Sequence, residues 1–136
     1  MKVLIDTNVI LDFFLARAPL YEAAKDIFKL ISQDEISAFA TASSITDIYY
    51  IAAKRLGDHA AREILRNLFS LLVIITVDGD DCAQALDLPV RDFEDALVTT
   101  CASKIDIDYI ITNDAYFLKI DTSLAHVVTP ADFLEL

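Results

Sequence analysis

The chain has 136 residues, a formal net charge of −11, two glycines and two histidines. Proteins that hold nucleic acid by their own charge are usually basic, because Lys and Arg contacts to phosphates supply much of the affinity. A chain this acidic therefore needs metal ions or a local basic patch to bind such an anion. The few glycines exclude a phosphate-cradling P-loop and a dinucleotide-binding GxGxxG motif. Histidines without paired cysteines, and the absence of GxSxG, argue against zinc and serine-triad chemistry.

Length and hydropathy indicate one domain, residues 1–136, folded around a single core. The longest apolar run, Leu71–Val77, is far short of the roughly 20 residues that span a bilayer. Asp6 interrupts the apolar stretch that a secretory signal would need. We therefore expect a cytoplasmic protein without a membrane span. Cys82 and Cys101 fall within helical patterns and are expected to pack as small apolar groups without pairing.

The hydrophobic pattern predicts strands that alternate with helices along the chain. Short apolar or β-branched runs predict strands at 2–5, 36–41, 71–77, 107–111 and 126–128. Apolar residues at helical spacing predict helices at 8–16, 20–31, 44–56, 58–69, 78–86 and 92–104, with a short one from 129. Gly57 is expected to end one helix and Asp58 to cap the next, while Thr129 caps the last helix with Pro130 at its first position. This alternation favours an α/β fold with a parallel sheet covered on both faces.

Four aspartates are predicted to meet at one edge of this sheet. Asp6 follows the first strand and Asp114 follows the fourth. Asp47 and Asp95 lie in the first turns of helices, and those turns face the same edge because the helices run antiparallel to the strands. Ligands of parallel α/β sheets bind at this carboxyl edge. The sequence thus brings four carboxylates from distant positions to one rim.

Each aspartate also has a purely local explanation. Asp6 fits the cap of the first helix, and Asp114 fits a turn. The segments 44–47 and 92–95 each resemble a capping box, in which an acid complements the helix N-terminus. Taken singly, these local roles explain the acids as well as a functional site does. Four independent caps have no reason to occur together in this order, so the joint pattern favours a site.

Clustered carboxylates need protons or a cation. Two carboxylates about 5 Å apart repel by roughly 3 kcal/mol at an effective dielectric near 20. Oxygen ligands without His or Cys favour Mg²⁺ or Mn²⁺ over Zn²⁺. Magnesium held by few carboxylates keeps waters and binds phosphate oxygens, which points to phosphodiester chemistry.

Several segments in order resemble a PIN domain of the toxin type often called VapC. They are "VLIDTNVILD", "SSITDIYYIA", "DFEDALVTTCA", "YIITNDAYF" and "VVTPADFL". The similarity spans essentially the whole chain. It implies a five-stranded parallel sheet in a three-layer α/β/α sandwich, usually dimeric. It also implies a Mg²⁺- or Mn²⁺-dependent, single-strand-specific endoribonuclease that acts as the toxin of a toxin–antitoxin pair.

The resemblance assigns roles to the acids at matching positions. Asp6, Asp95 and Asp114 match metal ligands of the family. Asp47 matches the remaining catalytic acid, at a position where many toxins have Glu, so its shorter reach suits a contact through water. Asp92 is one turn earlier than Asp95 and is a less certain contributor.

Two polar residues match positions that orient the site, Asn8 and Thr112, by hydrogen bonds to the acids or to a water. The basic residues Lys54, Arg55, Arg62 and Arg66 would either guide RNA or form a solvated helix face, and the second interpretation is favoured. The resemblance further implies an RNA substrate, an antitoxin that inserts a basic side chain among the acids, and a homodimer.

Other interpretations remain open at the sequence level. Phe13, Phe14 and Leu15 would form either an antitoxin groove or dimer interface, or part of the core. A non-catalytic PIN-fold module for RNA binding or scaffolding is the alternative function, although the complete acid set argues against it. A phosphoacceptor receiver domain is disfavoured, because Thr129-Pro130 stands where a Lys would be expected after the last strand.

Overall fold

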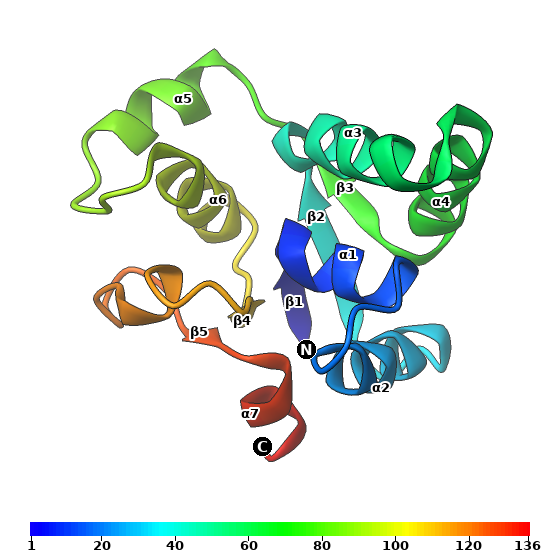
Figure 1. The fold of residues 1–136 in the computed structure, drawn as a ribbon. Coiled ribbons are helices and arrows are strands. Elements are labelled where there is room, and N and C mark those ends of the chain that lie inside the picture. The colour runs from blue at the N-terminus through cyan, green and yellow to red at the C-terminus, as the bar shows by residue number, and fades with distance from the viewer.

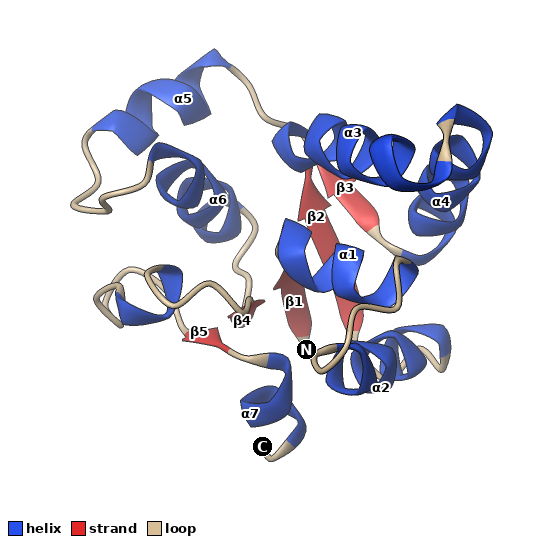
Figure 2. Cartoon of the chain, viewed as in Figure 1, coloured by secondary structure: helices blue, strands red, loops and turns tan.

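The computed structural model describes residues 1–136, in which strands and helices alternate (Figures 1 and 2). The strands are β1 Lys2–Ile5, β2 Ser37–Thr41, β3 Val73–Ile75, β4 Tyr109–Ile111 and β5 Val127–Val128. The helices are α1 Thr7–Phe14, α2 Tyr21–Ser32, α3 Ile45–Leu56, α4 Asp58–Leu71, α5 Gly79–Leu86, α6 Phe93–Lys104 and α7 Pro130–Leu134. Short 3₁₀ helices lie at Ala42–Ser44 (η1) and Phe117–Lys119 (η2). None of these helices is both long and apolar enough to cross a membrane.

The five strands form one parallel sheet in the order β3-β2-β1-β4-β5. The central strand, β1, pairs with β2 on one side and with β4 on the other. Its register aligns Ile5 with Ile111, and the Asp6 amide donates to the Ile111 carbonyl at 3.0 Å. The residues that follow these two strands, Asp6 and Thr112, therefore emerge side by side. The parallel α/β sheet expected from the sequence is confirmed.

Helices cover both faces of the sheet, as a three-layer sandwich requires. Figure 1 shows α1 to α4 on one side of the strands and α5 and α6 on the other. Val3 and Ile5 belong to the larger core cluster, whereas Leu4 belongs to the cluster that includes residues of α6 and η2. Alternate side chains of a strand point to opposite faces, and both faces of β1 are buried, which explains its continuous apolar sequence.

Helix ends differ from the sequence expectations at two places. Gly57 ends α3, as predicted, in a left-handed conformation with φ +92 that favours glycine, but it is also the N-cap of α4. The expected cap, Asp58, is instead the first residue of α4, and its carboxylate contacts Arg62 and Tyr49. Ser44 forms no capping box, because it is helical itself and its hydroxyl pairs with that of Thr41 at 2.9 Å.

The remaining boundaries are close to the predictions. The expected strand 71–77 is shortened to Val73–Ile75, because α4 continues through Leu71 and Leu72 packs in the core. The expected strand 107–111 begins only at Tyr109. Thr129 does cap α7, with Pro130 at its first position. Both cysteines are free thiols, as expected, and Cys101 is buried.

Candidate functional site

Asp6 lies where β1 ends and α1 begins, and it serves both as a helix cap and as part of a polar network. One carboxylate oxygen accepts a hydrogen bond from the Thr7 amide at 2.9 Å, so the cap expected from the sequence is present. The other oxygen accepts from the Thr112 hydroxyl at 2.7 Å and from the Asn8 amide group at 3.2 Å. Burial raises the pKa of the Asp6 carboxyl, and the hydrogen bond from Thr112 is the strongest opposing effect. Repulsion from Asp114 adds to the rise.

Thr112 connects the two central strands at this edge. Its hydroxyl is fully buried; it donates to Asp6 and accepts from the Asn8 side chain and the Asp114 amide, each at 3.0 Å. The Asn8 side-chain oxygen in turn accepts from the Asn113 amide at 3.0 Å. These bonds fix the direction of the Asp6 carboxylate. They supply the contacts that the predicted orienting role of Asn8 and Thr112 requires.

Asp114 combines a turn with a place at the same edge. Its Oδ1 accepts from the Tyr116 amide at 2.8 Å and from the Phe117 amide at 3.3 Å, so the turn considered from the sequence is formed. The turn leads directly into η2. Asp114 is therefore held rigidly beside the end of β4, one strand away from Asp6.

Asp95 is a buried carboxyl in the first turn of α6. It is 8% exposed, and no side chain donates a hydrogen bond to it. Burial is the largest cause that raises the pKa of Asp95 to about 7, and repulsion from Asp92 and Asp6 follows. Asp92 is the N-cap of α6 and accepts from the Asp95 amide at 3.1 Å, which is half of the capping box considered from the sequence.

One acid of this cluster is not among the predicted site residues. Burial raises the pKa of Glu94, and repulsion from Asp47 and Asp6 adds to the rise. The signal for it in the sequence is its position between Asp92 and Asp95, in the first turn of the same helix. Asp92 and Asp95 are three residues apart and share a helix face, whereas a residue between them is expected on another face. The sequence pattern therefore does not indicate Glu94 as a site residue.

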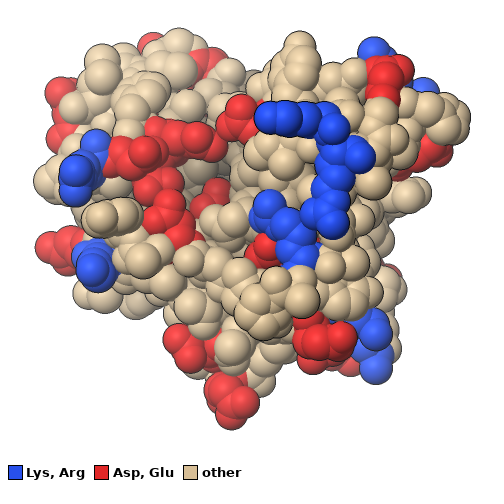
Figure 3. Space-filling model, viewed as in Figure 1, with Lys and Arg blue, Asp and Glu red and all other residues tan.

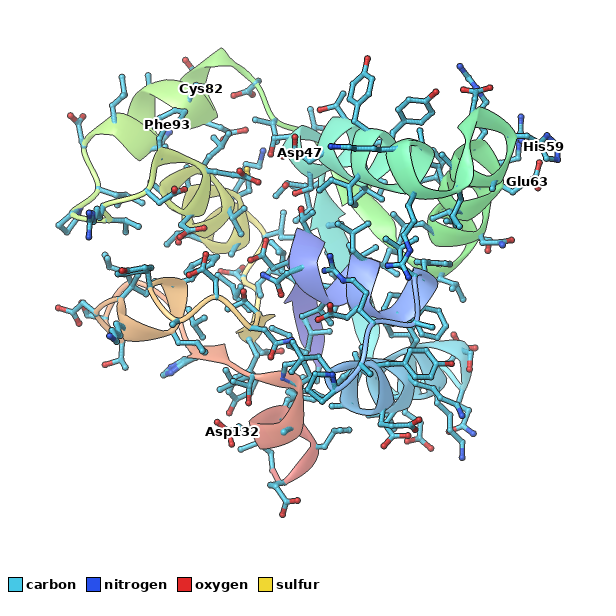
Figure 4. The ribbon with its side chains drawn as sticks, in the orientation of Figure 1. Asp47, His59, Glu63, Cys82, Phe93 and Asp132 are labelled. Carbon is cyan, nitrogen blue, oxygen red and sulfur yellow. The ribbon has the colours of Figure 1, made fainter.

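A single cavity of about 330 Å³ brings the predicted acids together. Its acidic lining residues are Asp6, Asp47, Asp92, Glu94, Asp95 and Asp114. Asp47 is exposed and stands at the end of α3 that lies nearest to α6 (Figure 4). Figure 3 shows acidic side chains around this hollow, with basic side chains on both flanks. As the side chains stand, no group of three or more His, Cys, Asp or Glu residues is close enough to hold one metal ion together.

The donor set nevertheless fits a hard divalent cation. The available ligand atoms are carboxylate, amide and hydroxyl oxygens, which suit Mg²⁺ or Mn²⁺ better than Zn²⁺. Magnesium in nucleotide-processing sites is held by one or two carboxylates, with waters and phosphate oxygens completing the shell. A cation would also relieve the repulsion that raises the pKa of Asp95.

Arg17 is a cation beside this acidic centre that the sequence pattern does not indicate. It lines the acidic cavity, and its Nε donates to the buried Asp12 carboxylate at 2.9 Å. Its terminal nitrogen donates to the Asn8 carbonyl at 3.2 Å, while Asn113 donates to the second Asp12 oxygen at 3.2 Å. The one available signal is a charged residue, Asp12, inside the otherwise apolar run from Val9 to Phe14. Arg17 is thus held by Asp12 and leaves the acids of the cavity without a cationic partner.

Two open questions from the sequence find structural answers. Phe13 and Phe14 are half-buried and pack with Phe28 of α2, with ring centroids 4.3 and 5.6 Å apart, and Leu15 is buried, so this segment contributes to the core. The exposed side of α4 carries ion pairs between residues of the same helix, Arg62 with Asp58 and Arg66 with Glu63. These pairs favour the solvated helix face over an RNA guide for the two arginines.

Comparisons with known proteins agree with this architecture. The chain is similar to Ribonuclease VapC1 of Aquifex aeolicus, with 25% identity over 139 residues that cover 98% of this chain and 94% of that protein. A chain in the crystal structure of VapBC2 from Rickettsia felis, bound to a DNA fragment from their promoter, has a TM-score of 0.72 at 14% identity. That match covers 95% of this chain and 98% of the other.

A second solved structure has the same fold. VapC20 of Mycobacterium tuberculosis, described as a Sarcin-Ricin loop cleaving toxin, has a TM-score of 0.64 at 16% identity. The match covers 90% of this chain and 92% of that one. The family model described as PIN domain matches residues 2–115, which include every acid that lines the cavity. The chain therefore belongs to the PIN domain family.

Proposed function

We propose that this chain is a Mg²⁺- or Mn²⁺-dependent endoribonuclease that cleaves single-stranded RNA in the cytoplasm as the toxin of a toxin–antitoxin pair. The observation that carries the proposal is the cavity at the carboxyl edge, in which six acidic side chains converge and none is in an ion pair. Such uncompensated carboxylates are typical of sites that bind cations or transfer protons. The similarity to a ribonuclease and to a toxin that cleaves an RNA loop supports RNA as the substrate.

In this proposal Asp6, Asp95 and Asp114 hold the metal, and Asp47 acts through a water. A metal held by these residues would supply Lewis acidity and would lower the pKa of a water at neutral pH. Thr112 and Asn8 keep the Asp6 carboxylate in one orientation by the hydrogen bonds described above. The Asp95 carboxyl, with its raised pKa, would be held in its ionised form by a cation, because positive charge favours the carboxylate.

Two partners are part of the proposal. An antitoxin would block the site by inserting a basic side chain, since an Arg guanidinium binds carboxylates in a bidentate manner. Solved relatives include a toxin–antitoxin complex from Klebsiella pneumoniae, with a TM-score of 0.69, which supports this partnership. We further propose that the chain, as one domain of residues 1–136, forms a homodimer.

The test is to incubate the purified chain with cellular RNA, and with matched single-stranded and double-stranded oligonucleotides, in Mg²⁺ or Mn²⁺. Cleavage of the single-stranded RNA is expected, with loss of activity in EDTA and in Asp6→Asn. Asp26→Asn, on the exposed side of α2, is the matched control and should cleave normally. Metal-dependent cleavage that persists in Asp6→Asn would remove that residue from the site. RNA binding without any cleavage would instead support the non-catalytic module.

A further inference from the structure

A second cavity adjoins the acidic one, shares three of its acids, and adds a cation and an aromatic ring. It also measures about 330 Å³ and is lined by Val90, Arg91, Asp92, Asp95, Asp114, Tyr116 and Ile120. Asp92, Asp95 and Asp114 line both cavities. A ligand that crosses the acidic centre on this side must therefore pass the residues of the second cavity.

Tyr116 is the exposed aromatic residue of this second cavity, with 67% of its surface accessible. The Arg91 guanidinium carbon lies 5.5 Å from the ring centroid, and the Lys119 ammonium lies 5.8 Å from it. Neither cation is in an ion pair. In a chain with a net charge of −11, two free cations around one exposed ring are the local basic patch that binding of a polyanion requires.

The position of this ring is tied to the acidic centre. The Tyr116 amide donates to the Asp114 carboxylate at 2.8 Å, in the turn that begins η2. The next residue, Phe117, is fully buried and anchors the turn in the core. The exposed ring therefore stands on a fixed backbone, two residues from an acid of the site, and does not lie on a loose loop.

We propose that Tyr116, Arg91 and Lys119 form a nucleotide-binding subsite for the nucleotide of single-stranded RNA next to the scissile phosphate. This proposal rests on the proposed function. The base stacks on the Tyr116 ring in place of a cation that lies over it in the free chain, because unpaired bases bind aromatic faces in single-stranded RNA recognition. Arg91 and Lys119 contact the flanking phosphates and offset the repulsion between RNA and the acids. A paired base in a duplex cannot stack in this way, so the subsite also accounts for a preference for single strands.

The experiment measures binding of a fluorescent single-stranded RNA oligonucleotide in Mn²⁺, in the cleavage-deficient Asp6→Asn background. Tyr116→Ala is expected to weaken binding by about 5- to 160-fold, the range for loss of one stacked base. Tyr116→Phe keeps the ring and should bind nearly as well as the parent. Phe69→Ala is the matched control, because Phe69 is an exposed aromatic residue on α4 that lines neither cavity.

The two cations have a separate readout, the salt dependence of binding. Removal of either one, in Arg91→Met or Lys119→Met, should lower the slope of log affinity against log salt by about 0.7 for each lost phosphate contact. Arg66→Met, an exposed arginine of α4, should leave the slope unchanged. A change of slope in Arg66→Met as large as that in Arg91→Met would contradict a specific subsite.

The outcomes separate this proposal from the proposed function. If the wild-type chain cleaves RNA but Tyr116→Ala binds and cleaves like wild type, the subsite is wrong and the nuclease stands. If RNA binding depends on Tyr116 but the wild-type chain never cleaves, Tyr116, Arg91 and Lys119 stand as a nucleotide-binding site, but its place beside a scissile phosphate and the nuclease are both wrong. If Tyr116→Ala impairs only association with a protein partner, the surface is a protein-docking surface and the subsite is overturned.

Discussion

Two buried carboxylates on neighbouring helices, Asp81 of α5 and Asp95 of α6, have opposite environments. Asp81 is 4% exposed; it accepts from the Lys104 ammonium at 2.7 Å and forms a reciprocal capping box with Asp78. The hydrogen bond from Lys104 is the main cause that lowers the pKa of Asp81. Asp95 is 8% exposed, is in no ion pair, and has its pKa raised to about 7, chiefly by burial and then by repulsion from neighbouring acids.

This difference offers a way to distinguish a buried carboxylate that stabilises the fold from one that binds a ligand. A buried carboxylate with a cation and hydrogen bonds is compensated within the chain, so it needs no ligand and connects elements of the fold. A buried carboxylate without either is unfavourable in the free chain, and it persists where a ligand or a proton completes it. By this criterion Asp81 and Lys104 join α5 to α6, whereas we propose that Asp95 belongs to a site. Asp12 and Arg17 form a second compensated pair, of which Arg17 lines the acidic cavity.

The largest effect is expected from neutralising an acid of the cavity. Asp6→Asn and Asp95→Asn should each lower RNA cleavage by more than about 100-fold, because even hydrogen-bonding partners of metal ligands contribute about 10- to 100-fold. Asp81→Asn should keep its cleavage rate. Initial cleavage rates on one single-stranded oligonucleotide check this contrast. Circular dichroism should first show that each variant is folded. An equal loss of cleavage rate in Asp81→Asn and Asp95→Asn would contradict the different roles assigned to the two acids.

The next effect is expected from the residue that orients Asp6. Thr112→Val preserves the shape of a fully buried side chain but removes its hydroxyl and the 2.7 Å hydrogen bond to the carboxylate. Metal affinity, measured by titration calorimetry with Mn²⁺, should fall by about 10- to 100-fold. Thr112→Ser restores the hydroxyl and should recover most of that affinity. An unaltered affinity in Thr112→Val would exclude the orienting role.

The compensated pair should affect stability and leave chemistry intact. Lys104→Met leaves the Asp81 carboxylate without its cation and removes the bond from Lys104 to the Thr76 carbonyl at 2.7 Å. The melting temperature should fall, and it should fall less in the double variant Lys104→Met/Asp81→Asn, where no unpaired charge remains. Cleavage at a temperature where all variants are folded should be unchanged. A stable but inactive Lys104→Met would place this pair in the site.

The smallest effect is the dependence of metal-free stability on pH. The folded-state pKa of Asp95 is about 7 and its ordinary value is 3.8, so the folded chain binds the proton more tightly than the unfolded chain between these values. Stability should therefore fall as pH rises from about 4 to about 7 and change little above that. The contribution is about 1–3 kcal/mol after solvent screening is allowed for.

Denaturant melts at several pH values in EDTA, compared between wild type and Asp95→Asn, measure this contribution. The fall should be smaller in Asp95→Asn, which has no carboxyl to ionise at that position. The contribution of Asp81 to stability has the opposite pH dependence. Its pKa is lowered in the folded chain, so it stabilises the fold above the ordinary pKa of an Asp, and this stabilisation is lost in acid. An identical pH profile in wild type and Asp95→Asn would mean that Asp95 is not an uncompensated charge.

Sequence patterns predict the fold better than they predict the residues that line the candidate site. The continuous apolar strand of β1 and the positions of Asp6 and Asp114 after strands are local features, and the parallel topology brings them to one edge. Arg17 and Tyr116 are not predicted, because their importance comes from residues far along the chain or from a cavity. At Ser44 the local pattern predicts a capping box that does not form, because the Ser44 hydroxyl bonds to the Thr41 hydroxyl instead.

Titration calorimetry with Mn²⁺ on the wild-type chain, Asp95→Asn and Asp81→Asn at one neutral pH tests the central claim most directly. The account predicts that wild type and Asp81→Asn bind the metal alike, and that Asp95→Asn loses most of the affinity while remaining folded. Wild-type protein without Mn²⁺ affinity, or Asp95→Asn with the affinity of wild type, would contradict the claim that the uncompensated acids form a metal site.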